Sequence, residues 1–497
     1  MGERMTVIEE PMLDFADNQT AEDPHDGLGL FGPFSLGTSS HPASPPHIVL
    51  GHPSGLAAWE AYAGQLNRPA ALSDPARHTL WPPFPGFEVA FGGRWSEDPV
   101  RVFQLGLNDL LQASRKSDPH ERCFAVVEKY LAHFEAAKKL DDRVGVAVCV
   151  VPDEVWQNCR PESHVVNPAE PKLSRQAKQL RKAGQLEMFA TFNREQYSLS
   201  PDFRRQLKAR TMKYDIPVQI LRESTLRLSE EKELGERGLT PLSDRLWNIG
   251  TALYYKCGGK PWRLRTARDG VCYIGIAFRF TEDRRSACCA AQMFLDSGDG
   301  IVFLGEFGPW YSQERRAFHL HPDAAEKLLK GILATYSGLD GRPLKEIFLH
   351  CRSFLDKDEF DGFKRACPKG CKLVGVRVRP DRFGPRLFRD GEMPVLRGTF
   401  WQVNARIGYL FGSGFKPRIC TYDGWETPVP LRIDIIHGEA EIELVAKDIL
   451  GLTKLNYNAC KLGDAQPVTV GFSDAVGEIL ISNPTVQDRR PNFKYYI

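Results

Sequence analysis

The chain has 497 residues and a mass of 56.0 kDa, with 42% hydrophobic and 26% charged residues. This composition is typical of a globular protein of two or three domains, and it excludes a disordered chain, a collagen and a small disulfide scaffold. The longest apolar run, residues 144–151, is far shorter than the roughly 20 residues that cross a bilayer. Because the acidic N-terminus also lacks the basic start of a signal peptide, we expect a cytoplasmic protein without membrane spans.

The net charge of +2 conceals an uneven distribution along the chain. Residues 1–60 hold nine acids and one base, a net charge of −8, whereas residues 171–270 hold 21 bases and 11 acids, a net charge of +10. A basic middle is what a phosphate-binding surface requires. The alternative is that these bases are spread over a solvated surface.

The twelve cysteines indicate reduced thiols. They include the adjacent pair Cys288 and Cys289 and one C-x3-C spacing, Cys367 to Cys371. Paired C-x2-C units, which commonly build structural zinc sites, are missing from the sequence. We therefore expect free cysteines in a reducing compartment.

Residues 1–45 are acidic and rich in Gly, Pro and Ser, so we expect an extended arm that buries little core of its own. Alternating strand and helix patterns follow and predict a doubly wound α/β unit over residues 46–258. Strands are expected at 47–50, 144–151 and 216–221, and helices at 100–113, 119–140, 172–186, 200–213 and 241–256.

A second unit is predicted over residues 259–497. Three consecutive strands are expected at 271–280, 287–295 and 300–306. Helices at 322–336 and 357–366 then alternate with strands at 347–350 and 373–378. This order of elements favours an RNase H-like fold.

Five segments resemble Argonaute proteins, and they follow one another along the chain in the order expected for that family. They are Lys213–Gln219 (KYDIPVQ), Leu253–Trp262 (LYYKCGGKPW), Tyr273–Ile276 (YIGI), Leu452–Asn458 with Pro467–Thr469, and Tyr495–Ile497. The resemblance implies a Rossmann-like MID domain at 46–258 and an RNase H-like PIWI domain at 259–497. It assigns Leu452–Asn458 to a late PIWI helix and Pro467–Thr469 to a strand. The chain is too short for N-terminal and PAZ domains as well, so it resembles a short prokaryotic Argonaute, a kind that works with an APAZ-containing effector.

The basic residues of the first unit suggest a pocket for the 5′-phosphate of a guide strand. Helical spacing places Arg204 and Lys208 on one face, and Asn248 and Lys256 on another. By resemblance, Lys208, Gln219 and Lys256 occupy the family's phosphate-binding positions. Two departures stand out: Arg204, one residue after Phe203, replaces an aromatic residue, and Ala252 replaces a second lysine.

Further roles follow from the resemblance. The carboxylate of Ile497 and the amide oxygen of Gln219 would hold Mg2+ against the phosphate, in keeping with the oxygen ligands that Mg2+ prefers. Lys260, Arg263 and Arg265 would follow the guide backbone. The alternatives are a frayed C-terminus and solvated basic side chains.

By the same resemblance, the acidic tetrad with which Argonaute proteins cut their targets is lost. Ala277 follows Tyr273–Ile276 where the first aspartate is expected, and Ser353 ends the segment His350–Ser353 where the second is expected. A methyl group and a hydroxyl cannot replace two carboxylate ligands of a metal pair. The alternative is a site rebuilt from Glu282, Asp283 or Glu306. Of the other candidate metal ligands, His319 and His321 are expected to be loop or surface histidines, because no Cys or His stands near them at ligand spacing.

These features together predict a guide-binding subunit that is not itself an enzyme. It would bind a 5′-phosphorylated short guide RNA and pair the guide with a single-stranded target, DNA in preference to RNA. Target binding would activate an APAZ effector with a TIR, a sirtuin-like NAD-consuming or a nuclease domain, in defence against invading DNA. The complex would be a heterodimer that can assemble further on activation, with residues 1–45 packing on the effector or on PIWI. The alternatives are a stand-alone guided nuclease and a nucleic-acid scaffold that needs no guide.

Overall fold

The computed structural model of the protein describes residues 3–140, 143–167, 196–197, 199–229, 239–280, 287–295, 300–314, 316–338, 342–422, 424, 426–482 and 489–497. The basic helix expected at 172–186 lies outside these residues, as do Glu282 and Asp283. Within the described ranges no helix combines the length and the apolar character that a bilayer span needs. No disulfide joins the cysteines described there.

The first unit is built on a four-stranded parallel sheet in the order β5-β4-β6-β7. Its strands are β4 (His47–Gly51), β5 (Arg101–Gln104), β6 (Val146–Val151) and β7 (Val218–Arg222). All of β6 is buried, as expected for a central parallel strand covered on both faces. The Rossmann-like prediction is therefore confirmed.

Seven helices are described in the first unit: α2 (Pro53–Leu66), α3 (Phe87–Phe91), α4 (Leu107–Ser114), α5 (Pro119–Ala137), α6 (Asp153–Asn158), α9 (Phe203–Thr211) and α10 (Leu242–Lys256). Helix α5 begins where its sequence predicts, because the Asp118 side chain accepts hydrogen bonds from the backbone N–H groups of His120 and Glu121. The helix expected at 100–113 is wrong. Residues 101–104 pair with β4 as strand β5, and α4 begins only after Gly106, so sheet pairing overrides the local helical spacing.

The second unit contains a nine-stranded mixed sheet in the order β1-β16-β17-β18-β15-β14-β9-β10-β11. Its strands are β1 (Arg4–Val7), β9 (Val271–Phe280), β10 (Ala287–Leu295), β11 (Gly300–Gly308), β14 (Glu346–Cys351), β15 (Lys372–Pro380), β16 (Thr399–Gln402), β17 (Ile407–Leu410) and β18 (Leu431–His437). Strands β9, β10 and β11 form an antiparallel meander, and β14 runs parallel to both β9 and β15. This is the predicted RNase H-like arrangement.

The helices described in the second unit are α11 (Pro322–Ser337), α12 (Lys357–Ala366), α13 (Ile442–Leu452), α14 (Val468–Gly471) and α15 (Ser473–Ile481). Two local predictions are wrong here. Residues 453–458 follow the end of α13 in turns, and residues 468–471 form the short helix α14 where a strand was expected. Helix α14 packs directly on β9 at Gly275, where a Cβ atom would lie 2.0 Å from the carbonyl oxygen of Thr469. This close approach leaves no room for a side chain at position 275 of β9.

The N-terminal segment is more structured than its composition suggests. Strand β1 pairs with β16 at the edge of the large sheet, which confirms that the segment packs on the second unit. Strands β2 (Leu13–Asp14) and β3 (Thr20–Ala21) form a small sheet with β8 (Arg263–Leu264), and helix α1 (Pro24–Phe31) follows. Because Leu13, Phe15 and Leu28 are fully buried in the main hydrophobic core, the prediction that the arm buries little core is wrong.

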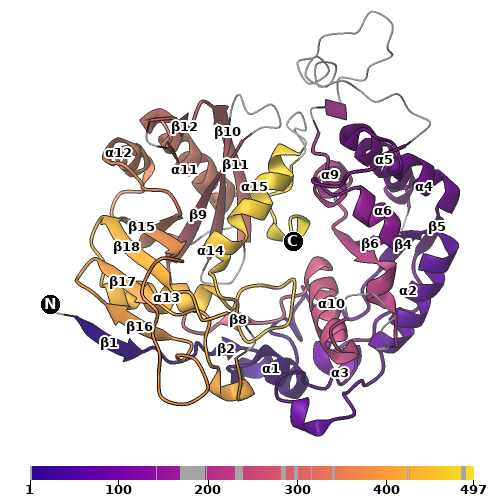
Figure 1. Ribbon diagram of the computed structural model, residues 1–497, viewed down its shortest axis with the longest axis horizontal. Coiled ribbons are helices and arrows are strands. Elements are labelled where there is room, and N and C mark those ends of the chain that lie inside the picture. The colour runs from indigo at the N-terminus through magenta and orange to yellow at the C-terminus, as the bar shows by residue number, and fades with distance from the viewer. Residues whose placement is uncertain are drawn as a thin grey trace, which may run out of the picture.

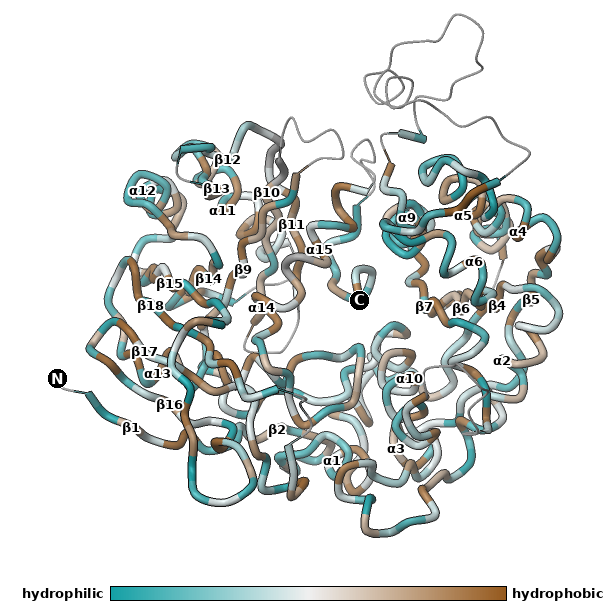
Figure 2. The backbone as a smooth tube through the Cα atoms, in the orientation of Figure 1, coloured by the Kyte–Doolittle hydropathy of each residue, from teal (hydrophilic) through white to brown (hydrophobic). Residues whose placement is uncertain are grey.

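The two units lie side by side, and the C-terminus lies between them close to α15 (Figure 1). Hydrophobic residues run along strands such as β7 and β9, as the brown segments in Figure 2 show. The segment after residue 488 joins the two units. The backbone N–H of Val302 in β11 donates to the carbonyl of Pro491, and the Tyr495 hydroxyl lies 2.6 Å from Oδ1 of Asp215 in the first unit. This arrangement places α9, β7 and the end of α10 next to the contact between the units.

Candidate functional site

Helix α9 carries two cations of a basic pocket. The Asp202 side chain caps the helix by accepting from the backbone N–H of Arg205, 2.9 Å away. Phe203 and Leu207 fill the core of the first unit, which leaves Arg204 and Lys208 one turn apart on another face. The Phe203 ring packs against Tyr130, with 5.3 Å between the ring centroids. It is therefore part of the core and not available to stack on a nucleotide base.

Helix α10 and strand β7 supply the remaining members of the pocket. Lys256 lies in the last turn of α10, and its Nζ donates to Oε1 of Gln219 on β7 across 2.5 Å. Lys208 and Lys256 are 4% and 1% exposed, whereas lysine is rarely buried without a partner. The structure thus brings together Lys256 and Gln219, which are 37 positions apart in sequence.

The surroundings of the pocket disfavour the protonated form of its two lysines. Burial, together with the charges of Arg204 and Lys256, lowers the pKa of Lys208 well below its usual value. Burial and the nearby Arg204 lower the pKa of Lys256 to about 7. Neither lysine has a carboxylate neighbour in the part of the chain that the structure describes. A phosphate bound here would stabilise the protonated lysines, because it would supply hydrogen-bond acceptors in place of the lost water and a negative charge beside them.

Asn248 does not reach this pocket. It lies two turns before Lys256 on α10, about 12 Å away at 1.5 Å per residue. Its Oδ1 accepts a hydrogen bond of 2.9 Å from the backbone N–H of Cys460 in the second unit. In this structure Asn248 joins the two units.

The three cations expected along the guide backbone contact the N-terminal segment. Arg263 and Arg265 form ion pairs with the buried carboxylate of Asp14, at 2.8 and 3.0 Å. The backbone N–H of Lys260 donates to Oγ of Ser35 across 2.9 Å. Lys260 also lines a separate cavity of about 310 Å³ that includes Lys494. Asp14 thus neutralises one of the two positive charges of Arg263 and Arg265.

Sequence reasoning missed the ion pairs that hold α9 against the second unit. Glu478 on α15 lies 2.7 Å from Arg205 on α9 and 3.4 Å from Arg279 on β9. The same carboxylate, together with Asp202, partly offsets the burial that lowers the pKa of Arg204. These residues come from distant segments without a shared motif, so no local pattern could have identified the contact.

At the end of the large sheet where the resemblance predicts a slicing site, Ala277 and Ser353 stand in place of two of the expected acids. Ala277 on β9 lies one residue beyond Ile276, which pairs with Cys351 at the end of the parallel strand β14. The side chain of Arg352 donates to Oε1 of Gln466 and to the carbonyl of Val470, both at 3.1 Å. His350 is buried, with Nδ1 2.9 Å from the Thr469 hydroxyl, and burial lowers its pKa to about 3. A neutral buried histidine and a bonded arginine thus lie near this strand end.

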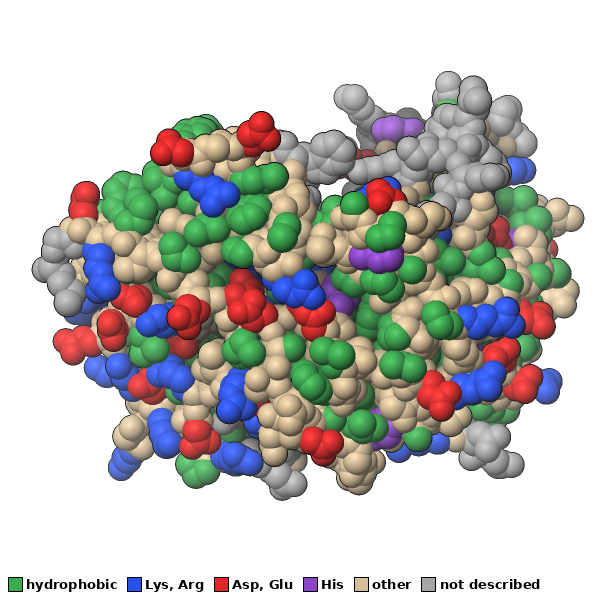
Figure 3. All heavy atoms as spheres, turned by 90° about the horizontal axis from the view of Figure 1, so that it is seen from below, with side chains coloured by type: hydrophobic (Ala, Val, Ile, Leu, Met, Phe, Trp, Pro, Cys, Tyr) green, Lys and Arg blue, Asp and Glu red, His purple; other side chains and the backbone are tan. Residues whose placement is uncertain are grey.

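The molecular surface seen from below carries interspersed charges. In Figure 3, Lys and Arg side chains alternate with Asp and Glu, and no large area of one sign appears on this face. The excess of positive charge in the first unit thus does not form a basic patch on this face. The basic feature of the first unit described above is instead the pair of buried lysines, Lys208 and Lys256, beside the half-buried Arg204.

Comparison with known proteins places this geometry in context. No family model matches the chain. A curated relative, the protein argonaute of Aquifex aeolicus, is 22% identical over 286 residues, which cover 55% of this chain and 35% of the relative. The chain therefore spans only about a third of the length of this relative.

Solved structures match almost the whole chain. Clostridium butyricum Argonaute bound to a guide DNA and a 19-mer target DNA has a TM-score of 0.62 and 17% identity, over 100% of this chain and 55% of that one. Aa-Ago with externally bound siRNA gives 0.58 and 16%, over 99% and 56%. Aquifex aeolicus Argonaute gives 0.55 and 15%, over 96% and 53%. The chain thus has the fold of just over half of an Argonaute protein, the part that contains MID and PIWI, and the curated relative supports a relationship to that family.

Proposed function

We propose that the pocket of Arg204, Lys208, Gln219 and Lys256 binds the 5′-phosphate of a guide strand in an Argonaute-like protein. The observation that carries this proposal is the pair of buried lysines, whose pKa values are lowered by burial and by neighbouring cations. A terminal phosphate carries close to two negative charges at neutral pH and three acceptor oxygens, which match these donors. Similar structures were solved with guide and target DNA or with siRNA, which supports a nucleic-acid ligand.

The guide is a short 5′-phosphorylated RNA, and the target is a complementary single strand, with DNA preferred. Specificity comes from base pairing, while the protein holds the backbone and the duplex shape. Binding weakens strongly with salt, because each neutralised phosphate releases counterions.

The binding test compares a 5′-phosphate RNA with the same RNA ending in a 5′-hydroxyl, at one salt concentration. Wild type is compared with Lys208→Met and with the matched control Lys213→Met, since Lys213 is exposed. The 5′-phosphate should strengthen binding to wild type and to the control, but much less to Lys208→Met. Equal affinity of wild type for both RNAs would reject the guide pocket and favour a scaffold that needs no guide.

The protein itself does not cut its target in this proposal. Ala277 and Ser353 occupy the positions that the resemblance assigns to two metal-binding aspartates, and neither side chain can replace a carboxylate ligand. The side chain of Glu306 is not among those described, and neither are Glu282 and Asp283. Incubation of guide-loaded protein with labelled target and Mg2+ or Mn2+ decides the matter, because guide-directed cleavage would establish a rebuilt nuclease site.

The proposed Mg2+ at the guide phosphate is not favoured by the arrangement of the pocket. Oε1 of Gln219, the expected ligand, already accepts a hydrogen bond from the ammonium of Lys256. Arg204 and Lys208 add further positive charge nearby. Ile497 is buried next to the C-terminal contact between the units, but a cation beside Gln219 would face these three bases.

A guide-bound sensor without its own nuclease requires an enzyme elsewhere. The resemblance to short prokaryotic Argonautes suggests an APAZ-containing effector with a TIR, a sirtuin-like NAD-consuming or a nuclease domain, in defence against invading DNA. Co-purification with the candidate effector, followed by NAD+ and nucleic-acid degradation assays with and without target, tests this part separately. An effector whose activity does not change on addition of target would refute the sensor role, even if guide binding is confirmed.

A further inference from the structure

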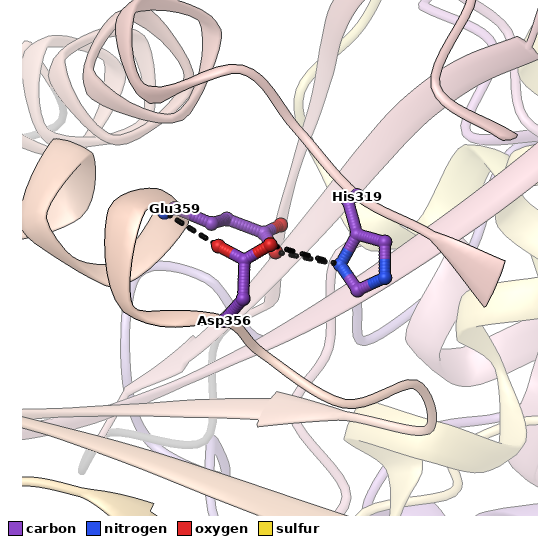
Figure 4. A group of neighbouring side chains, drawn as sticks. All are labelled: His319, Asp356 and Glu359. Atoms are coloured by element: carbon purple, nitrogen blue, oxygen red, sulfur yellow. Dashed lines mark hydrogen bonds and ion pairs between the residues drawn. The ribbon is translucent and has the colours of Figure 1, made fainter. Parts of the chain in front are cut away.

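Three side chains of the second unit converge at the start of helix α12, away from the basic pocket. His319 lies between β13 (Ala317–Phe318) and α11, while Asp356 and Glu359 belong to the first turn of α12. Figure 4 shows the two carboxylates pointing toward the imidazole ring. Nδ1 of His319 lies 3.6 Å from Oδ2 of Asp356 and 3.6 Å from Oε2 of Glu359.

Backbone groups fix the orientation of both carboxylates. Oδ1 of Asp356 caps α12 by accepting from the backbone N–H of Glu359, at 2.9 Å. Oε1 of Glu359 accepts from the backbone N–H of Leu320, at 3.2 Å. Each carboxylate therefore uses one oxygen to hold its position and directs the other oxygen toward His319. Such outer contacts are what orient the ligands of protein metal sites.

The separations suit three ligands of one ion better than a hydrogen-bonded group. Hydrogen bonds between nitrogen and oxygen measure about 2.7–3.2 Å, so 3.6 Å is too long for a good one. A tetrahedral ion at about 2.0–2.2 Å from each ligand would separate them by roughly 3.3–3.6 Å. The three ligand atoms all lie within 4.8 Å of one another.

The buried carboxylate of Glu359 provides the second, independent indication. The residue is 2% exposed, and its Oε2 has no hydrogen-bond partner among the residues that the structure describes. A buried carboxylate oxygen without a partner is costly, and such groups usually pair or coordinate a metal. Burial, with a contribution from the charge of Asp356, raises the pKa of Glu359 to about 8. A dication between the two carboxylates would supply the missing positive charge.

We infer that His319, Asp356 and Glu359 form a binding site for a divalent transition-metal ion of the Zn2+ class. One imidazole and two carboxylates favour such an ion over Mg2+ or Ca2+, which prefer oxygen ligands alone. Three protein ligands leave a fourth position for water. The ion would tie the loop before α11 to the start of α12. The expectation that His319 is only a loop histidine missed this group, because its carboxylate partners lie 37 and 40 residues away in sequence.

Metal titration of the intact chain tests the inference. Metal-free protein is titrated with Zn2+ by calorimetry, and the bound zinc is then counted by mass spectrometry after dialysis. Glu359→Gln keeps the volume and an oxygen for the Leu320 N–H but removes the charge. Its matched control is Asp358→Asn, on the exposed side of the same turn. His319→Gln is compared in the same way with His321→Gln, since the His321 side chain is 70% exposed. Melting in the presence of a chelator verifies that each variant folds.

Wild type and both controls should bind one more zinc ion than the two site variants, or bind it at least about tenfold more tightly. Zinc held by cysteines elsewhere would remain in all five proteins and so would not mimic this pattern. The same zinc content in wild type and Glu359→Gln would overturn the inference. It would also be overturned if wild type bound no zinc. Tighter binding of Mg2+ than of Zn2+ would overturn the assigned class of ion.

Discussion

Replacing Lys208 by methionine should stabilise the free protein and weaken guide binding, two effects of opposite sign from one change. Methionine keeps a similar length and volume but has no charge. Lys208 is 4% exposed, and its nearest charges, Arg204 and Lys256, are both positive. The ammonium group therefore destabilises the folded protein unless an anion binds beside it.

The size of each effect follows from this environment. Replacing even a buried ion pair with well-packed apolar groups of similar volume is often neutral or stabilising by about 1–4 kcal/mol, and for a buried lysine without an acidic partner we expect a gain within this range. Removing a hydrogen bond to a charged group costs about 1.5–3 kcal/mol, which corresponds to roughly a tenfold to hundredfold loss of affinity for 5′-phosphate RNA. RNA with a 5′-hydroxyl should bind both proteins alike, because it does not engage this lysine.

Denaturant unfolding without nucleic acid measures the first effect, and fluorescence anisotropy with both RNAs measures the second. Lys213→Met serves as the control in each assay, since an exposed lysine should change neither quantity much. A variant that is less stable than wild type in the absence of RNA would refute the argument that Lys208 is an uncompensated charge. A variant that is more stable but retains its preference for 5′-phosphate would refute only the role of Lys208 in binding.

Four further predictions concern pH and the N-terminal segment. The pKa of Lys256 is lowered to about 7 in the folded protein, so above this pH the unfolded chain binds more protons than the folded one. Relative to Lys256→Met, the free energy of unfolding should therefore rise by up to about 1.4 kcal/mol per pH unit between pH 7 and 10. Binding of 5′-phosphate RNA should weaken over the same interval, and an affinity independent of pH would contradict a protonated Lys256 in the complex. Glu10 lies 2.9 and 2.7 Å from two almost fully buried cations, so Glu10→Gln should cost about 3–5 kcal/mol, whereas the exposed Glu9→Gln should cost little; equal melting temperatures of the two variants would disprove the importance of this contact. Leu13→Ala should cost about 2–5 kcal/mol through the cavity it leaves in the core, and a loss below 0.5 kcal/mol would show that the segment is not held as described.

The central strands and helices of both units could be predicted from sequence because their patterns are local. The run at Val271–Phe280 and the helix at Lys357–Ala366 match the structure at both ends. The sequence did not reveal that Val102 belongs to a strand, because its partner lies in β4, about 50 residues earlier. Pairing across the sheet decides such segments, and no local pattern records it.

The same distinction applies to the candidate sites. Lys208, Gln219 and Lys256 were found because a known family places similar residues at these positions, and the contact of Lys256 with Gln219 is present in the structure. Arg263 was expected on the guide backbone, but the acid that neutralises it, Asp14, lies 249 residues away. The group around His319 was missed for a similar reason. Charges can be counted from sequence, but their partners depend on the tertiary fold.

The pairing of β1 with β16 has a consequence for synthesis of the chain. Thr6 in the first strand lies opposite Phe400, so the edge of the large sheet cannot close until most of the polypeptide has left the ribosome. Until then the apolar side chains of the first thirty residues have no place in a finished core. Such distant contacts form slowly, and they leave apolar surface open to aggregation or chaperones in the meantime. The N-terminal segment can therefore pack in its final position only after the second unit has been synthesised and folded.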